Sequence, residues 1–387
     1  MNSTHRVNVV KIDEILPHNG ADTLGIVYIG GYQVVVKKDD FKIGDLAIYV
    51  QPDTIVPATE PFKFLWADRE FADGTVPERL RRITVRRFRK EWSEGLLMPL
   101  STFGQVVSAT SFRVLCKDRT ALPPSATLGQ CSSYTLVGEG DDVAELLGFK
   151  HYEEPDSTYV LGTQGRKLTL LQRILKYFGF GPKPFEPKSG PGVYDVESVK
   201  NYPRAIPEGT SVIATEKIHG SNARYYFDGK QFWVGSHKKW WKDKTNIWWR
   251  VAQNNPWIEA FCRANPKHTL RGEVTPTQTG YQYGATPEEQ FFAFDVQLPD
   301  GTYMDKLRLY GTFSALGGIM KLVPMAYHGP YDAGLLKTLA EGKTLVDGAK
   351  HIREGIVVST ATEQQVRGLG RAQLKIKSMK FLEKENA

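Results

Sequence analysis

The chain has few cysteines and no metal-ligand pattern, and both shortages narrow its class. Cys116, Cys131 and Cys262 are scattered through 387 residues, without the spacing of a zinc site or a disulfide framework. The eight histidines are dispersed as well, so a structural zinc site is not expected. An odd and sparse set of cysteines is typical of free thiols in the reducing cytoplasm, where we expect the protein to work.

Membrane signals are missing from the sequence too. The longest apolar runs are far shorter than the roughly 20 residues that a transmembrane helix needs. The segment Met1–Val10 contains no apolar stretch like that of a secretory signal. We therefore expect no membrane partner, and we expect the chain to act as a monomer.

Acidic residues are in slight deficit, since 43 Asp and Glu face 50 Lys and Arg and the net charge is +7. This modest excess suits a polyanionic partner. It is concentrated between Arg79 and Lys90, where seven of twelve residues are cationic. The alternation of Ile83 and Val85 predicts a strand whose basic face follows a phosphate backbone. A solvated edge strand protected by its charge is the alternative.

The chain divides into stretches of different composition. Short β-branched segments with glycine turns over residues 7–57 predict a small β-barrel like an OB module. Four prolines and four glycines between Gly179 and Gly192 mark the best linker candidate. From Val193 onward strands and helices alternate irregularly, which predicts an antiparallel-rich α+β domain. The expected division is an N-terminal module over 1–150, a linker or insertion over 151–192 with a helix over 168–180, and the α+β domain over 193–387.

One short segment has catalytic potential: Thr215–Asn222 reads TEKIHGSN. The apolar strand before it should place Lys217 at a strand end, on a rigid support. Gly220 and Ser221 are small enough for a ligand to approach the backbone closely. Alone the pattern is weak, because a surface lysine before a turn is more common. It gains weight from four further blocks in order, which are Arg271–Glu273, Phe291–Val296, Glu354–Val358 and Leu374–Lys377.

These five blocks, in this order, resemble the motifs of the covalent nucleotidyltransferase superfamily of ATP-dependent ligases and capping enzymes. The fit is closest to the RNA ligases, and the resemblance covers residues 193–381. It implies that Lys217 attacks ATP and becomes a covalent lysyl-AMP. The AMP then passes to an RNA 5′-phosphate, and a 3′-hydroxyl attacks that phosphate and releases AMP.

A nucleophilic lysine must lose its proton, although the pKa of a free lysine is near 10.4. Nearby cations lower such a pKa. Lys375 and Lys377 lie two positions apart, so on a strand both point to one face and can converge on a phosphate. The resemblance places these two lysines at the α-phosphate. It assigns Glu273 to the ribose or a metal-bound water and Glu354 to a Mg²⁺ or Mn²⁺ ion, and carboxylates suit such ions.

The remaining motif residues concern the nucleotide. Glu216, His219 and Asn222 are expected to supply polar contacts around the lysine. His219 stands where many members of the superfamily have Asp, and a neutral imidazole is a poorer Mg²⁺ ligand than a carboxylate. Phe294 is expected to stack on adenine, with Phe292 as the alternative because both share one strand face.

Basic and aromatic residues are interleaved between Trp233 and Trp257, a segment that holds six of the eight tryptophans. This pattern suits base stacking and phosphate contact. Paired tryptophans also build cores, so both interpretations stay open at this point. The residues expected to contact RNA are Arg82, Arg86, Arg87, Arg89, Lys238 and Lys239.

The order of modules narrows the expected activity. DNA ligases and capping enzymes carry an OB domain after the last motif, whereas here ten residues follow Lys377 and the barrel-like module comes first. This order resembles the RNA ligase clade that seals nicks between 3′-OH and 5′-phosphate ends in duplexed RNA. The alternatives are a DNA or DNA-templated ligase, a capping guanylyltransferase, and a noncatalytic RNA-binding protein with a relic domain.

Overall fold

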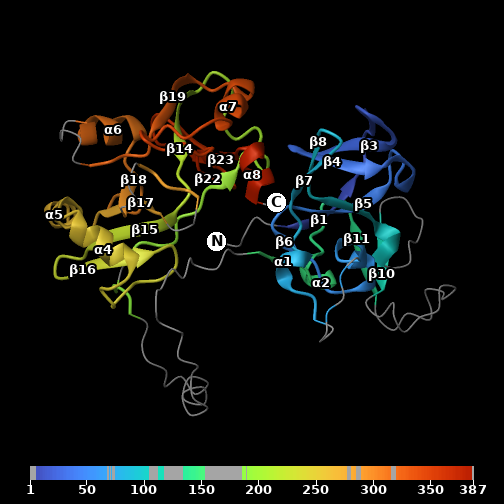
Figure 1. Ribbon diagram of the computed structural model, residues 1–387, viewed down its shortest axis with the longest axis horizontal. Helices are drawn as coiled ribbons and strands as arrows, with labels where there is room; N and C mark the ends of the chain where they lie inside the picture. Colours follow the sequence, from blue (N-terminus) through green and yellow to red (C-terminus); the bar gives the residue numbers. More distant parts are fainter. Residues whose placement is uncertain are drawn as a thin grey trace, which may run out of the picture. The chain divides into compact units, whose positions relative to one another are not determined.

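A computed structural model describes most of the chain (Figure 1). The described residues are 6–67, 69, 71, 75–103, 112–116, 134–152, 185–188, 190–276, 280–284, 289–314 and 320–385. By internal contacts the chain forms two compact units, one of Met1–Glu153 with Leu382–Ala387 and one of Glu154–Phe381. Within the described residues, no helix is long and apolar enough to cross a bilayer. Cys131 and the helix expected over 168–180 lie outside them.

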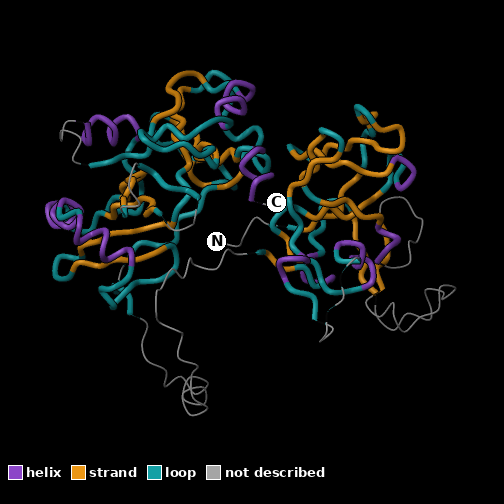
Figure 2. Tube along the Cα trace, in the orientation of Figure 1, coloured by secondary structure: helices purple, strands orange, loops and turns teal. Residues whose placement is uncertain are grey.

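The N-terminal unit consists mainly of short antiparallel strands (Figure 2). Its sheets have the orders β1-β5-β9 and β2-β3-β4, and the pairs β7-β8, β10-β11 and β12-β6 complete it. The strands are β1 (Val7–Lys11), β2 (Leu16–His18), β3 (Ala21–Ile29), β4 (Tyr32–Lys37), β5 (Leu46–Val50), β6 (Thr54–Ile55), β7 (Val85–Phe88), β8 (Glu91–Glu94), β9 (Leu96–Pro99), β10 (Phe112–Cys116), β11 (Tyr134–Gly138) and β12 (Lys150–His151). The short helices are η1 (Lys38–Asp40), η2 (Glu60–Leu65), α1 (Glu78–Arg81), η3 (Leu100–Phe103) and α2 (Ala144–Leu147).

The β3–β4 hairpin illustrates how the sequence determines this unit. Gly30 in the turn has a φ of 56°, which glycine adopts without the steric cost of a side chain. The register pairs Val27 with Val34, and both are buried in one of the unit's two hydrophobic clusters. Tyr28, one position along, points to the other face and is exposed. The predicted strands on either side of this turn are confirmed.

The basic segment Arg79–Lys90 differs in part from its prediction. Its first residues form helix α1, and strand β7 begins only at Val85. Pro77 stands just before this helix, where proline is tolerated because the first amide groups of a helix lack partners in any case. Ile83 and Val85 are buried as predicted, whereas all five residues over 86–90 are exposed.

The C-terminal unit contains two larger sheets, with the orders β13-β23-β20-β14-β19 and β16-β15-β17-β18. Within them all pairings are antiparallel except β13 with β23, so the expected antiparallel-rich α+β fold is confirmed. The strands are β13 (Glu197–Ser198), β14 (Ser211–Lys217), β15 (Ser221–Phe227), β16 (Phe232–Ser236), β17 (Thr269–Thr275), β18 (Gln290–Gln297), β19 (Met325–Pro330), β20 (Gly355–Thr360), β21 (Gln365–Val366), β22 (Gly370–Arg371) and β23 (Gln373–Lys377). The helices are α4 (Ile247–Asn254), α5 (Trp257–Ala264), α6 (Lys306–Ser314), α7 (Ala333–Ala340) and α8 (Met379–Glu385).

Helices cover the outer faces of these sheets and leave the catalytic motifs on the inner strands. Helices α4 and α5 pack on the sheet of β15, β16 and β17 (Figure 1), while α7 packs on β20 and β23. The tryptophans build the first of these cores. Trp248 is buried in it, and Trp241 stacks on Trp248 with ring centroids 5.0 Å apart. For these rings the core interpretation of the aromatic segment is correct.

Candidate functional site

Three neighbouring strands place the predicted catalytic residues side by side. The register sets Lys217 of β14 opposite Gly355 of β20, and Gly355 opposite Lys377 of β23. Glu354 directly precedes Gly355, so its carboxylate lies at the same end of the sheet. Lys375 is two positions before Lys377 on β23 and shares its face. Residues that are more than 130 positions apart in the sequence therefore meet at one strand edge.

Glycines allow the close packing behind Lys217. A Cβ at Gly220 would collide with the carbonyl oxygen of Val274, and a Cβ at Gly272 would collide with the ring of Phe291. Only glycine fits where a strand backbone packs this closely. Each of the two predicted blocks thus contains a glycine that brings its neighbouring polar residue near the site. Asn222 and Glu273, from the two blocks, are directly paired across β15 and β17.

Glu354 is the electrostatic centre of the site. Its Oε1 lies 2.6 Å from Lys217 Nζ and 3.8 Å from Lys377 Nζ, and its Oε2 lies 3.3 Å from His219 Nδ1. Burial acts to raise the pKa of this carboxyl, but Lys217, the hydrogen bond with His219 and Lys377 outweigh burial and hold the pKa well below its ordinary value. The carboxylate therefore stays ionised at neutral pH and binds the candidate nucleophile as an ion pair.

Two other groups of the site are poised near neutrality. Burial raises the pKa of Glu273 to about 8, because the opposing effect of Lys217 is smaller and the charge of Glu354 adds to the rise. Burial, reinforced by Lys377 and Lys217, lowers the pKa of Lys375 to about 8. Perturbed groups of opposite type gathered in one place are characteristic of functional sites. Both gain or lose a proton easily when a charged ligand arrives.

Glu273→Gln is expected to stabilise the unliganded protein in a pH-dependent way. Folding raises the pKa of this acid, so burying the carboxyl costs nothing below its ordinary pKa and progressively more stability as the pH rises toward 8. The neutral amide escapes this cost. Melting temperatures of the wild type and the variant should coincide near pH 5 and diverge by pH 8, with the variant higher. A gap that does not change with pH would contradict the raised pKa.

A metal ion fits this donor set through few protein ligands. Among the described residues, no group of three or more His, Cys, Asp or Glu is arranged to hold a metal directly. Mg²⁺ keeps several waters and needs only one or two carboxylates. The ionised Glu354 meets that requirement, and Glu273 can join it after losing its proton. The residues expected to bind metal therefore suit a hydrated Mg²⁺ or Mn²⁺ ion.

The two candidate adenine-stacking rings differ in exposure. Phe292 is only 3% exposed and forms part of a hydrophobic cluster with Ile218, so no face of its ring is open to a ligand. Phe294 is half-buried at the edge of the same cluster, and its ring centroid lies 5.0 Å from that of Tyr194. The geometry therefore favours Phe294, the first choice from the sequence.

Sequence reasoning missed the residues that hold Phe294 in place. Next to it, Asp295 is fully buried and lies 2.8 Å from Arg371 and 3.1 Å from Lys306, while the hydroxyl of Tyr194 donates to it at 2.6 Å. Burial acts to raise the pKa of Asp295, but the two cations outweigh it and set the pKa at about 2. These partners come from distant segments, and no spacing along the chain could have linked them.

The polar residues of the first motif are divided between two directions. Glu216 is buried, and its Oε2 accepts a hydrogen bond from the Leu345 amide at 2.6 Å. As the strand neighbour of Lys217 it points to the opposite face, so its expected contact near the amine is not formed. His219 packs its ring against Tyr281, with centroids 4.4 Å apart, and its amide donates to the Tyr283 hydroxyl. His219 is thus held for its contact with Glu354.

The predicted RNA-binding arginines do not form one set. Arg82 lies 2.5 Å from Asp53, and its guanidinium stacks over Tyr152 at 4.0 Å, so it ties the fold together. Arg86, Arg87 and Arg89 are exposed on and beside strand β7. In the C-terminal unit Lys238 and Lys239 are also exposed, and the Lys239 ammonium lies 4.0 Å from the centre of the Trp241 ring. These five, and not Arg82, remain available to a phosphate backbone.

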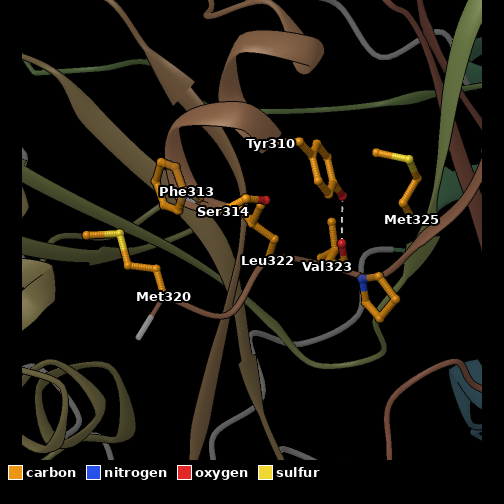
Figure 3. A pocket seen from close by; sticks show the side chains of 8 residues that line it. Tyr310, Phe313, Ser314, Met320, Leu322, Val323 and Met325 are labelled. Atoms are coloured by element: carbon orange, nitrogen blue, oxygen red, sulfur yellow. Dashed lines mark hydrogen bonds between the residues drawn. The ribbon is translucent and has the colours of Figure 1, made fainter. Parts of the chain in front are cut away.

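A separate apolar groove lies beside helix α6 (Figure 3). Its volume is about 280 Å³, and it is lined by Tyr310, Phe313, Ser314, Met320, Leu322, Val323, Pro324 and Met325. The lining includes no charged side chain and none of the predicted site residues. A triphosphate needs cations, so this groove does not suit a nucleotide.

Two family models match separate parts of the chain. Residues 210–377 match the model described as RNA ligase, and residues 6–100 match a model described as an OB-fold domain. All of the predicted catalytic residues lie in the first match. A search of curated proteins found no match.

Solved structures with the same fold come from Naegleria gruberi. The chain is similar to mutants of its RNA ligase solved with ATP and Mn (23% identity, TM-score 0.69, covering 99% of this chain and 100% of that one) and with AMP and Mn (21%, 0.68, 99% and 100%). It is also similar to that ligase solved with PPi (21%, 0.67, 99% and 99%). At this level of identity the likeness establishes the fold.

Proposed function

Because the chain combines an OB-fold domain with an RNA ligase domain, we propose that it is an ATP-dependent RNA ligase working through a lysyl-AMP on Lys217. The observation that carries the proposal is the group of Lys217, Lys375 and Lys377 gathered around one buried carboxylate, Glu354. Three lysines beside a single carboxylate leave an excess of positive charge. That excess suits the phosphates of ATP and of an RNA end.

The chemistry consists of three transfers at phosphorus. Lys217 Nζ bonds to the α-phosphorus of ATP as the bond to pyrophosphate breaks. An oxygen of the RNA 5′-phosphate then displaces Lys217 and takes the AMP. Finally the RNA 3′-hydroxyl loses its proton, attacks the activated 5′-phosphate and expels AMP. At each transfer Lys375 and Lys377 stand ready to neutralise charge on the oxygens of the transferred group.

Lys217 cannot attack while its ammonium is bound to Glu354. A Mg²⁺ or Mn²⁺ ion held by Glu354 would supply positive charge beside the α-phosphate and would take over the carboxylate that pairs with Lys217. His219 hydrogen-bonds the same carboxylate and fixes its orientation, which accounts for a histidine at this position. The two relatives solved with Mn and a nucleotide support the use of a divalent ion.

We propose nicked duplex RNA as the substrate, with ATP as the nucleotide. The OB-fold domain before the ligase domain supports this choice over a DNA ligase. We also propose that the chain works as a cytoplasmic monomer with functional parts over 1–150, 151–192 and 193–387.

Sealing of nicked duplexes tests the proposed activity. The substrates carry a 5′-phosphate and either a ribose or a deoxyribose 3′-OH end at the nick. With ATP and Mg²⁺ we expect efficient sealing of the all-RNA nick. Efficient sealing of all-DNA nicks alone would favour the DNA ligase alternative. Labelling by GTP in place of ATP would favour a capping enzyme, and no labelling at all would favour a relic domain.

A further inference from the structure

The β7–β8 hairpin has a turn that the sequence does not make easily. Arg89 and Lys90 connect the two strands with φ values of 42° and 81°. Two-residue hairpin turns with positive φ at both positions strongly favour Asn-Gly or Gly-Gly, because a β-carbon is strained there. Two long cationic side chains in this place cost stability. Strain of this kind marks a candidate for a ligand contact.

Several contacts hold the hairpin in one conformation. Arg87 donates to the Lys90 carbonyl at 3.2 Å, and its guanidinium lies 5.2 Å from the centre of the Trp92 ring. Arg89 donates to the Gly20 carbonyl at 3.1 Å. The His18 ring lies 3.0 Å from the Phe88 carbonyl. The tip is therefore ordered in advance, and little freedom is lost when a ligand binds.

The ordered tip exposes one aromatic ring among cations. Phe88 is 44% exposed, and Arg86, Arg87, Arg89 and Lys90 around it are exposed as well. In the part of the chain that the structure describes, none of these four cations forms an ion pair. The nearby carboxylate of Glu91 is hydrogen-bonded to Asn19 and Gln33 instead. Nothing within the unit uses the ring of Phe88 or neutralises the charge around it.

The chemistry of this tip distinguishes between kinds of RNA. A double helix offers phosphates but keeps its base faces stacked, so cations alone would serve to bind it. An unpaired nucleotide offers a free base face, which stacks on an aromatic ring, together with a phosphate for the cations. We infer that the β7–β8 hairpin binds unpaired nucleotides of the RNA substrate, with Phe88 stacking on a base. This inference rests on the proposal that the substrate is RNA.

The test compares single-stranded and fully paired RNA of the same sequence, using the full chain and fluorescence anisotropy without ATP. Phe88→Leu keeps an apolar side chain but loses the stacking face. It should weaken single-strand binding about tenfold and leave duplex binding unchanged. Phe64→Leu is the matched control, because Phe64 on η2 is 55% exposed and should affect neither RNA. Arg86→Gln and Lys90→Gln should each lower the salt dependence of single-strand binding by about 0.7 in slope.

Three outcomes would overturn the inference: no loss with Phe88→Leu, equal loss for both RNAs, or the same loss with Phe64→Leu. A Phe88→Leu change that appears only in self-association would assign the ring to a protein contact and would overturn it too. None of these outcomes involves lysyl-AMP formation. Failure of the hairpin proposal is therefore separate from failure of the ligase proposal, which ATP labelling decides.

Discussion

Lys217→Ala is expected to form no covalent protein–AMP adduct when incubated with Mg²⁺ and ATP labelled at the α-phosphate. The amine is the proposed attacking group, and no other lysine of the site can replace it. Lys375 and Lys377 approach the same region from strand β23, but there they face the position of the transferred phosphate. The variant should also fail to seal nicks supplied with a free 5′-phosphate.

This loss should come without unfolding. Glu354 keeps its contacts with His219 and Lys377 when Lys217 is removed, so the buried charge is not left alone. Lys230→Ala is the matched control, because Lys230 is exposed in the turn before β16. It should label like the wild type. A Lys217→Ala protein that is folded and still carries AMP would move the nucleophile elsewhere.

Glu354→Gln is expected to lower both stability and activity. Removing this carboxylate leaves Lys217, Lys375 and Lys377 without their shared counter-charge, and breaking a buried pair of this kind costs about 3 kcal/mol. For a unit of this size the loss corresponds to about 6–12 °C in melting temperature. Adduct formation should fall by about 10²–10³, as when one preorganised electrostatic group is removed.

The stability effect of Glu354→Gln has a defined pH dependence. Folding depresses the pKa of Glu354, so its contribution is complete above the ordinary carboxyl pKa and is lost as the pH falls toward the folded value. The melting temperatures of wild type and variant should therefore differ at pH 7 and converge in acid. Glu259→Gln breaks an exposed helical pair with Arg263 and should change the melting temperature little at any pH. A variant as stable as the wild type at pH 7 would contradict the account.

Much of the site could be predicted because strand patterns and motif order are local signals. The alternation of apolar residues placed Lys217 at a strand end and put Lys375 and Lys377 on one face, and the structure has both features. The choice of Phe294 over Phe292 needed burial, which the sequence pattern left open. The order of the blocks indicated that Glu354 belongs to the site, but not what it contacts.

The rest depends on pairing between distant segments. The ion pair of Lys217 with Glu354 follows from the register of β14 against β20, and nothing local in the sequence sets that register. Arg82 looked like its basic neighbours until Asp53 was found 2.5 Å away. Glu216 looked like a site residue, but strand alternation turns it toward Leu345. In each case a residue type was read correctly while its partner was decided by tertiary packing.

Locating the AMP on the protein tests the central claim most directly. The wild-type chain is incubated with ATP and Mg²⁺, digested under conditions that preserve the phosphoramidate, and its peptides are mapped by mass spectrometry. The account predicts AMP on the peptide that contains Lys217 and on no other lysine. AMP attached elsewhere, or a protein that never acquires AMP, would contradict it.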